Sequence, residues 1–282
     1  MKNFYIITNE CKDPDFKITY RIRDYLVKCG RNCMIRNQGR NNNGHTDISL
    51  LKDDVDCVLV LGGDGTLLQA AVDLADLSMP FLGINLGTLG FLAEVNKADI
   101  EPALEKLLAG EYEIEKRMML VGYVYSPDQE KDNTRALNDI VITRKGSLQI
   151  ITFTISVNGQ FLHRYSADGI IVATPTGSTG YNLSAGGPVV DPKAQLMVIS
   201  PICPHSMQHN SIVLSPEDEI TITIETGHDG IRQEVEAIFD GSHRVTLFTD
   251  DKIVIKRSEK TTGIVKLNKA SFLEILHGKM ND

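Results

Sequence analysis

The sequence predicts two architectures in one chain, an α/β part followed by an all-β part. Over about the first 110 residues, runs typical of buried strands alternate with helical patterns, as in a doubly wound parallel sheet. After Arg117 the pattern changes to short β-branched runs, separated by turn signals such as Asn158-Gly159 and Asp240-Gly241. This second pattern is typical of a β-sandwich.

Each element of the α/β part has its own signal. Asp13-Pro14 predicts a helix start with Asp13 as N-cap, and Gly30 ends the helical periodicity that follows. Gly110 likewise ends a helical pattern. The predicted elements are strands at 4–8, 33–35, 55–61 and 81–84, and helices at 14–29, 66–77 and 99–109.

These patterns divide the chain into three segments. We expect residues 1–116 to form the α/β domain and residues 117–264 to form the β-rich domain. Residues 265–282 include SFLEILHGKM, which has a helical pattern and is expected to return to the α/β domain. The polar segment 36–47 is expected to be a loop that takes no part in the chemistry.

Composition excludes several classes of protein. A net charge of −8 disfavours nonspecific nucleic-acid binding, which depends on clustered Lys and Arg. No stretch approaches the roughly 18 apolar residues of a membrane span, and Glu10 and Lys12 interrupt the region where a signal peptide needs apolar residues. The five scattered cysteines predict reduced thiols, and Cys29 and Cys33 lack the second pair of a zinc site. We therefore expect a cytoplasmic protein that binds neither nucleic acid nor membranes.

The turn Gly62-Gly63-Asp64-Gly65-Thr66 joins a strand to a helix, at the sheet edge where α/β folds bind ligands. Its glycines allow close approach of a ligand, and helix-opening amides can face phosphate oxygens. The turn is neither a P-loop, because it has no lysine, nor a dinucleotide fingerprint. Asp64 has two interpretations, a helix cap or a catalytic carboxylate. The flanking glycines favour the second, because a simple cap does not require them.

Two further motifs interrupt apolar strands or follow them. Asn85-Leu86-Gly87-Thr88-Leu89-Gly90-Phe91 follows the next strand and should reach the same sheet edge. Phe91 either stacks on a base or packs in the core. Asn138-Asp139 breaks an apolar strand, so either one of these side chains is buried and needs a partner, or the pair lies in an exposed bulge.

The segment 166–192 carries the most information about function. Nearly every residue from Thr174 to Pro188 is small, hydroxylic or a turn former, and Tyr181 is the one large side chain. Such a segment is expected to pack no core and to present hydroxyls, amides and a ring to a ligand. Its prolines indicate a specified shape rather than a flexible linker. Asp168, before the preceding strand, can accept hydrogen bonds from sugar hydroxyls.

Together these motifs resemble the NAD kinase family. The chain carries GGDGT at 62–66, NLGTLGF at 85–91, LND at 137–139 and DGIIVATPTGSTGYNLSAGGP at 168–188, in the family's order. GGDGT is shared with lipid kinases, whereas the last block is much more specific. The resemblance implies a Rossmann-like N-terminal α/β domain, a C-terminal β-sandwich and self-association as a homodimer or homotetramer. It also implies phosphoryl transfer from ATP or polyphosphate, with Mg²⁺ or another divalent cation, to the 2′-hydroxyl of the adenosine ribose of NAD.

The resemblance implies roles for individual residues. Asp64 is then the catalytic carboxylate. The residues implied to bind NAD are Asp64, Gly65, Phe91, Asn138, Asp139, Asp168, Thr179, Gly180, Tyr181, Asn182, Leu183 and Ser184. Four residues differ from those usual in the family: Gln69, Ser166, Gly180 and Ser242. These differences are expected to affect affinity and the choice of phosphate donor more than the class of reaction.

Phosphoryl transfer to an alcohol requires an aligned nucleophile and neutralised phosphate charge. We expect Asp64 to accept the 2′-hydroxyl proton as general base from about 3 Å. Helix-opening amides and the divalent cation would stabilise the donor phosphates, with the cation carrying more of the charge because the turn has no lysine. Two alternatives remain at this point: a lipid or sphingoid-base kinase, for which no apolar patch is evident, and a nonenzymatic NAD(P)-sensing module.

Overall fold

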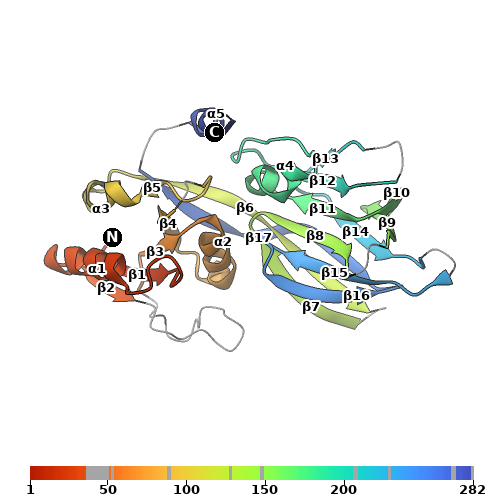
Figure 1. Cartoon of the computed structure of the whole chain (residues 1–282), viewed down its shortest axis with the longest axis horizontal. Helices are drawn as coiled ribbons and strands as arrows, with labels where there is room; N and C mark the ends of the chain where they lie inside the picture. The colour runs from red at the N-terminus through yellow and green to blue at the C-terminus, as the bar shows by residue number, and fades with distance from the viewer. Residues whose placement is uncertain are drawn as a thin grey trace. The chain divides into compact units, whose positions relative to one another are not determined.

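The computed structural model describes residues 1–35, 51, 54–87, 90–126, 129–146, 149–205, 209–227, 230–267 and 271–280 (Figure 1). The chain divides into two compact units: Met1–Arg117 with Lys260–Asp282, and Met118–Glu259. It passes from one unit to the other within strands β6 (Glu113–Ser126) and β17 (Lys252–Lys266). The expected loop at 36–47 lies outside the described residues.

The first unit is built on a parallel sheet of order β2-β1-β3-β4, beside which the last part of β17 pairs with β4. Its strands are β1 (Asn3–Thr8), β2 (Asn32–Ile35), β3 (Cys57–Gly62), β4 (Pro80–Asn85) and the short β5 (Val95–Asn96). Because β1 lies between β2 and β3, the strand order reverses at β1. The carboxyl ends of β1 and β3 therefore meet at the switch point, where doubly wound folds bind ligands.

Helices cover both faces of this parallel sheet. On one face, α1 (Lys17–Lys28) and α3 (Ile100–Ala109) share a core with the strands. On the other face lies α2 (Asp64–Asp73), whose Leu67 Cδ1 is 2.9 Å from where a Cβ of Gly83 would be. The other helical segments in the described part of this unit are η2 (Ala75–Leu77), η3 (Lys97–Asp99) and α5 (Phe272–Met280). Gly110 ends α3 in a left-handed conformation (φ 82°), which confirms that prediction.

Two predicted helix starts are wrong. Asp13 and Pro14 lie in a turn, and α1 begins at Lys17. The Asp13 carboxylate still satisfies the helix start from outside, because it accepts hydrogen bonds from the N–H groups of Ile18 (3.3 Å) and Thr19 (3.0 Å). Helix α2 begins two residues before its predicted start, so that Asp64 is its first residue.

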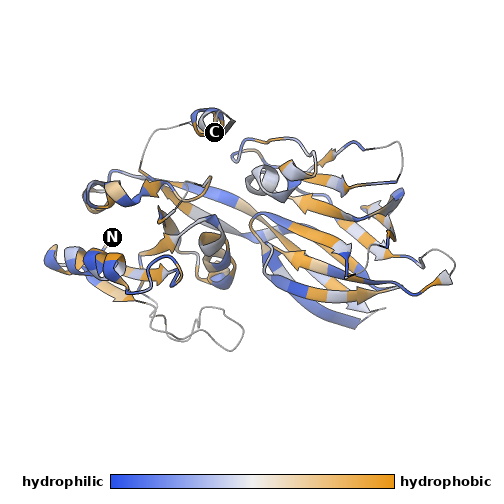
Figure 2. Ribbon diagram, in the orientation of Figure 1, coloured by the Kyte–Doolittle hydropathy of each residue, from blue (hydrophilic) through white to orange (hydrophobic). Residues whose placement is uncertain are grey.

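The second unit is a β-sandwich of antiparallel strands, as predicted. One sheet has the order β13-β12-β11-β8-β15-β16, and the facing layer contains β10-β9-β14-β17 and the β6–β7 pair. Alternate residues of both layers form one core, and Figure 2 shows hydrophobic residues along these strands. The strands not yet given are β7 (Gln129–Ala136), β8 (Asp139–Arg144), β9 (Ile151–Val157), β10 (Gln160–Ala167), β11 (Gly169–Ala173), β12 (Met197–Ile202), β13 (Ile212–Leu214), β14 (Ile220–Ile224), β15 (Glu234–Phe239) and β16 (His243–Phe248).

Two short helical segments follow β11 in this unit, η4 (Thr176–Thr179) and α4 (Tyr181–Ser184). All five cysteines are free, as the sequence predicts. In the part of the chain that the structure describes, no helix has the length and apolar character needed to cross a membrane.

Candidate active site

Asp64, in the first unit, is held by three backbone N–H groups of the turn after β4. Its Oδ2 accepts from Phe91 (2.7 Å), and its Oδ1 accepts from Leu92 (3.2 Å) and Ala93 (3.1 Å). The carboxylate therefore faces a neighbouring turn, and the interpretation as a simple cap of its own helix is wrong. Since a carboxylate has about four acceptor positions, Oδ2 keeps one for a ligand hydroxyl.

The structural reason for glycine differs between the positions of these motifs. A Cβ at Gly90 would lie 1.9 Å from Asp64 Oδ1, and a Cβ at Gly62 would lie 2.3 Å from Thr66 Oγ1. A Cβ at Gly65, by contrast, would meet no described atom within 4 Å. Close packing therefore requires Gly62 and Gly90, whereas Gly65 leaves open space beside the first turn of α2. Residues 88 and 89 of the NLGTLGF motif lie outside the described residues.

Lys12 is a charged neighbour of these turns that sequence reasoning missed. Its Nζ lies 2.9 Å from the Cβ position of Gly63 and 3.2 Å from that of Gly87. The loop after β1 is fixed, because Asn9 Nδ2 donates to Thr66 Oγ1 (3.2 Å) and the N–H of Lys12 donates to the Asn9 carbonyl (3.0 Å). The turn itself has no lysine, but the loop after β1 places the ammonium of Lys12 beside it. The sequence feature that could have predicted this proximity is the position of Lys12 just after the first strand of a doubly wound sheet, at the edge where such folds bind ligands.

Phe91 is half-buried and contacts the C-terminal helix of the same unit. Its ring centroid lies 6.3 Å from that of Phe272, and Lys279 Nζ lies 5.0 Å from its centroid. Of the two interpretations of Phe91, packing is the one that this structure supports. Gln69, where the family usually has a cation, donates a hydrogen bond to Asp73 Oδ1 within α2 (2.7 Å).

In the second unit, Asn138 is positioned by the segment that follows β11. The N–H of Thr174 donates to the Asn138 carbonyl (2.8 Å), and the Thr174 hydroxyl donates to the Leu137 carbonyl (2.6 Å). A Cβ at Gly177 would lie 2.1 Å from the Asn138 carbonyl oxygen. Thr174 and Gly177, which belong to the most specific sequence block, thus fix the backbone of the LND motif.

Asn138, Asp139 and Gly180 come together at one place. A Cβ at Gly180 would lie 3.4 Å from Asn138 Nδ2 and 3.8 Å from Asp139 Oδ2. Oδ1 of Asn138 is buried and has no hydrogen-bond partner among the described residues. Because buried polar atoms are nearly always hydrogen-bonded in native proteins, this oxygen is an acceptor suited to a donor on a ligand.

Burial dominates the electrostatics of Asp139. The residue is only 5% exposed. Burial, together with the charge of the neighbouring Asp240, raises the pKa of the Asp139 carboxyl to about 7. Burial also raises the pKa of Asp240 to about 6. The backbone N–H groups that donate hydrogen bonds to this carboxylate oppose the effect, because they lower its pKa. The interpretation of Asn138-Asp139 as an exposed bulge is therefore wrong.

The segment after β11 has a specified shape, as predicted, but uses many of its polar groups internally. Ser178 Oγ donates to the Pro175 carbonyl (2.7 Å) and accepts from the N–H of Val190 (2.9 Å). The expectation that this segment packs no core is wrong in part, because Ala185 and Val190 pack on the outer face of the β11 sheet.

Asn182 belongs to this internal framework. Its side chain is fully buried, donates to the carbonyls of Ser178 (3.2 Å) and Pro188 (3.1 Å), and accepts from Ser200 Oγ (2.7 Å). In this structure the Asn182 side chain therefore supports the segment, and none of its surface is exposed to a ligand. Among the residues of this segment that are implied to bind NAD, the side chains that stay accessible belong to Thr179, Tyr181, Leu183 and Ser184.

Asp168 lies at the opposite end of β11 from this cluster. Thr143 pairs with Gly169, and Asp139 pairs with Ala173. Since a strand rises about 3.3 Å per residue, Asp168 and Thr174 are roughly 20 Å apart. Asp168 pairs instead with Arg144 (3.5 Å), so within one chain it does not share a pocket with Asp139, contrary to the expectation.

Both units match families of known proteins. Residues 4–112 match the ATP-NAD kinase N-terminal domain, and residues 137–267 match the ATP-NAD kinase C-terminal domain. The two matches cover most of the chain, in this order. The chain belongs to the NAD kinase family.

Relatives within this family extend over the whole chain. The chain is 44% identical to an NAD kinase of Lachnospira eligens, covering 99% of this chain and 100% of the relative. It is 42% identical to an NAD kinase of Lachnoclostridium phytofermentans, with 100% of both chains covered.

Solved structures of NAD kinases share the fold. An NAD kinase from Archaeoglobus fulgidus in complex with ATP has a TM-score of 0.77 and 26% identity, covering 100% of this chain and 99% of that chain. A yeast NADH kinase complexed with NADH has a TM-score of 0.84 at 24% identity, covering 100% and 88%. Family membership removes the lipid-kinase alternative.

Proposed function

We propose that this chain transfers the γ-phosphoryl group of ATP to the 2′-hydroxyl of the adenosine ribose of NAD, giving NADP and ADP. The 2′-oxygen forms the new O–P bond, the bond from the γ-phosphorus to the ADP oxygen breaks, and the hydroxyl proton passes to Asp64 Oδ2. The observation that carries this role is the fixed Asp64 carboxylate, which is oriented by three amides and keeps an acceptor position on Oδ2.

In this proposal NAD is held mainly by the second unit. Asn138 supplies its unpaired acceptor and Asp139 its carboxyl, beside the backbone of Gly180. Gly65 allows the ribose to approach Asp64 closely. The accessible side chains that we assign to contact with the dinucleotide are Thr179, Tyr181, Leu183 and Ser184.

We assign the donor phosphates to the switch point of the first unit. The ammonium of Lys12 lies beside Gly63 and Gly87, at the carboxyl ends of β1, β3 and β4. Charge-assisted hydrogen bonds from an ammonium to phosphate oxygens stabilise the negative charge of the donor. Lys12 thus supplies from the β1 loop the cation that the GGDGT turn lacks.

A divalent cation belongs with the donor in this proposal. Among the described residues, no group of three or more His, Cys, Asp or Glu side chains could hold a metal ion. A metal centre held by the protein alone therefore does not fit these residues. Mg²⁺ would enter bound to the ATP phosphates, as part of the substrate.

Self-association as a homodimer or homotetramer is also part of the proposal. We assign Asp168, roughly 20 Å along β11 from the Asp139 cluster, to the dinucleotide held by another copy of the chain. Light scattering after size exclusion gives the subunit number. We also propose a cytoplasmic location, in keeping with five free cysteines.

One assay tests the reaction. Purified protein is incubated with ATP, Mg²⁺ and NAD, and NADP is measured with an NADP-specific dehydrogenase. We expect NADP to accumulate with time and enzyme concentration. NAD binding without any NADP would favour the nonenzymatic sensor and overturn the proposal. Replacing ATP by polyphosphate, and NAD by NADH, gives the donor and acceptor preferences.

A further inference from the structure

The tip of the β15–β16 hairpin directs one carboxylate at the LND motif. Asp240 and Gly241 both have positive φ (45° and 70°), and the N–H of Ser242 donates to the Phe239 carbonyl (3.0 Å). Two consecutive left-handed residues closed by this hydrogen bond make the tight turn whose twist suits a hairpin. Aspartate tolerates the left-handed conformation better than most residues, so Asp240 can occupy this corner.

Asp240 accepts hydrogen bonds from three consecutive backbone N–H groups. Oδ2 accepts from Leu137 (2.7 Å), and Oδ1 accepts from Asn138 (2.8 Å) and Asp139 (3.0 Å). The N–H of Asp240 also donates to the Asp139 carbonyl (3.1 Å). Thr174 occupies the carbonyls of Leu137 and Asn138. The polar backbone groups of the LND motif are thus fixed from two sides.

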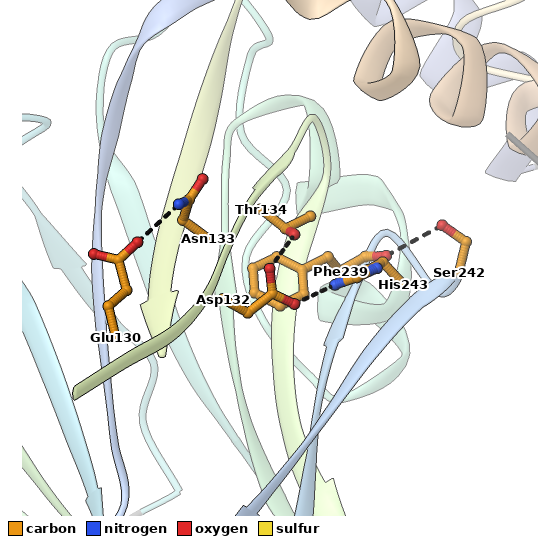
Figure 3. Close-up of polar contacts among 7 residues, drawn as sticks. All are labelled: Glu130, Asp132, Asn133, Thr134, Phe239, Ser242 and His243. Atoms are coloured by element: carbon orange, nitrogen blue, oxygen red, sulfur yellow. Dashed lines mark hydrogen bonds and ion pairs between the residues drawn. The ribbon is translucent and has the colours of Figure 1, made fainter. Parts of the chain in front are cut away.

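The hairpin is itself tied to the neighbouring layer. His243 Nε2 lies 2.7 Å from Asp132 Oδ2 on β7, a contact shown in Figure 3. The same figure shows Ser242 Oγ bonded to the Phe239 carbonyl (3.4 Å). A Cβ at Gly122 would lie 2.8 Å from the Phe239 ring. The close approach of β6 and the His243–Asp132 contact leave the corner that carries Asp240 little freedom.

We propose that Asp240 is a positioning residue for the dinucleotide: its carboxylate holds the Leu137–Asp139 backbone so that the Asn138 amide and the Asp139 carboxyl face the ligand. This inference rests on the proposed binding of NAD at Asn138 and Asp139. Without Asp240, three partly buried N–H groups lose their acceptor, and the motif is free to turn its side chains away. Asp240 does not contact the ligand itself in this proposal, and it affects binding only through the positions of Asn138 and Asp139.

The test compares Asp240→Asn and Asp240→Ala with Asp250→Ala. Asp250 has the same left-handed backbone (φ 73°) in the turn between β16 and β17, but its side chain is exposed. For each protein we would measure the equilibrium Kd for NAD, the KM values for NAD and ATP, kcat and Tm. The binding measurement needs no turnover, so it tests Asp240 even if the proposed reaction fails.

We expect Asp240→Ala to raise the Kd and KM for NAD by about 10- to 100-fold, while the KM for ATP stays within about twofold. Asp240→Asn should lie between, because its amide oxygen can still accept from Asn138 and Asp139 while its NH₂ group faces the N–H of Leu137. It is isosteric, and it keeps the test decisive if the alanine variant does not fold. Asp250→Ala should keep the wild-type Kd, KM and kcat values, with only the small fall in Tm expected for alanine in a left-handed turn.

Two results would overturn the positioning role. One is a folded Asp240→Asn or Asp240→Ala protein with the wild-type affinity for NAD. The other is a parallel rise of the KM values for NAD and ATP together with a fall in Tm, which would indicate general loosening of the fold. A wild-type protein that binds NAD but makes no NADP would refute the proposed reaction alone.

Discussion

The carboxylate of Asp64 occupies the space into which any side chain at position 90 would project. A Cβ at Gly90 would lie 1.9 Å from Oδ1 and 2.2 Å from Oδ2, well inside van der Waals contact. The glycine of one motif is therefore required by the carboxylate of another. This relationship makes the GGDGT and NLGTLGF turns a single structural unit, in which the turn after β4 orients the proposed base.

Gly90→Ala is expected to displace the Asp64 carboxylate from the N–H groups of Phe91, Leu92 and Ala93. The overlap should cost about 1–3 kcal/mol of folding free energy and lower kcat by at least about tenfold, because an unoriented base transfers the proton less efficiently. Steady-state assays and urea denaturation measure the two effects. The matched control is Gly278→Ala, which would meet no described atom within 4 Å. A wild-type kcat in the Gly90→Ala protein would contradict the proposal that the turn after β4 orients Asp64 for catalysis.

Asp64→Asn tests the base itself. Loss of general-base catalysis should lower kcat by about 10²- to 10⁴-fold, with little change in the Kd for NAD. The asparagine NH₂ group must also face one of the backbone N–H groups that donate to the carboxylate in the wild type. Because this hydrogen bond is lost, stability should fall by about 1 kcal/mol. Asp76→Asn, at an exposed position beyond α2, serves as control. A folded Asp64 variant with wild-type turnover refutes the assignment.

Lys12→Met removes the proposed donor contact and keeps the length of the side chain. We expect the KM for ATP to rise about tenfold, because a charge-assisted hydrogen bond to phosphate is lost, while the KM for NAD stays unchanged. Lys12→Arg should recover part of the affinity. Lys17→Met controls for charge, since Lys17 is exposed and pairs with Asp15 nearby (3.1 Å). If the Lys12 and Lys17 variants have the same KM for ATP, Lys12 does not bind the donor.

The local parts of this architecture could be predicted from sequence, because they depend on neighbouring residues. The continuous apolar run of β3 and the helix end at Gly110 follow from periodicity and glycine chemistry. The start of α1 could not be predicted in the same way. The Asp13 side chain satisfies the helix from a turn outside it, and this alternative has the same sequence signature as an N-cap.

The contacts that organise the site depend on strand order, which the sequence does not reveal directly. Lys12 approaches Gly63 only because β1 pairs with β3. Asp240 reaches the LND motif only because β15 pairs with β8, which places residues about a hundred positions apart in register. The Asp240-Gly241 pair signalled a turn in the sequence, but not what its carboxylate would face. Motifs thus identified the family chemistry, and tertiary pairing identified the supporting residues.

The buried Asp139 predicts a specific dependence of stability on pH. Its pKa is about 7 in the folded protein, against about 3.9 in an unfolded chain. Between these values the folded state binds more protons than the unfolded state, so the contribution of Asp139 makes stability fall as pH rises from about 4 to about 7, and stay level above that.

Asp139→Asn removes this loss. The variant should therefore gain stability over the wild type at pH 8, by at most on the order of 4 kcal/mol, and gain little at pH 4. Urea denaturation at both pH values measures the difference, and Asp250→Asn, at an exposed position, should show none. An Asp139 variant with the same stability difference at pH 4 and pH 8 would mean that the carboxyl is already ionised in the folded protein below pH 4, in spite of its burial.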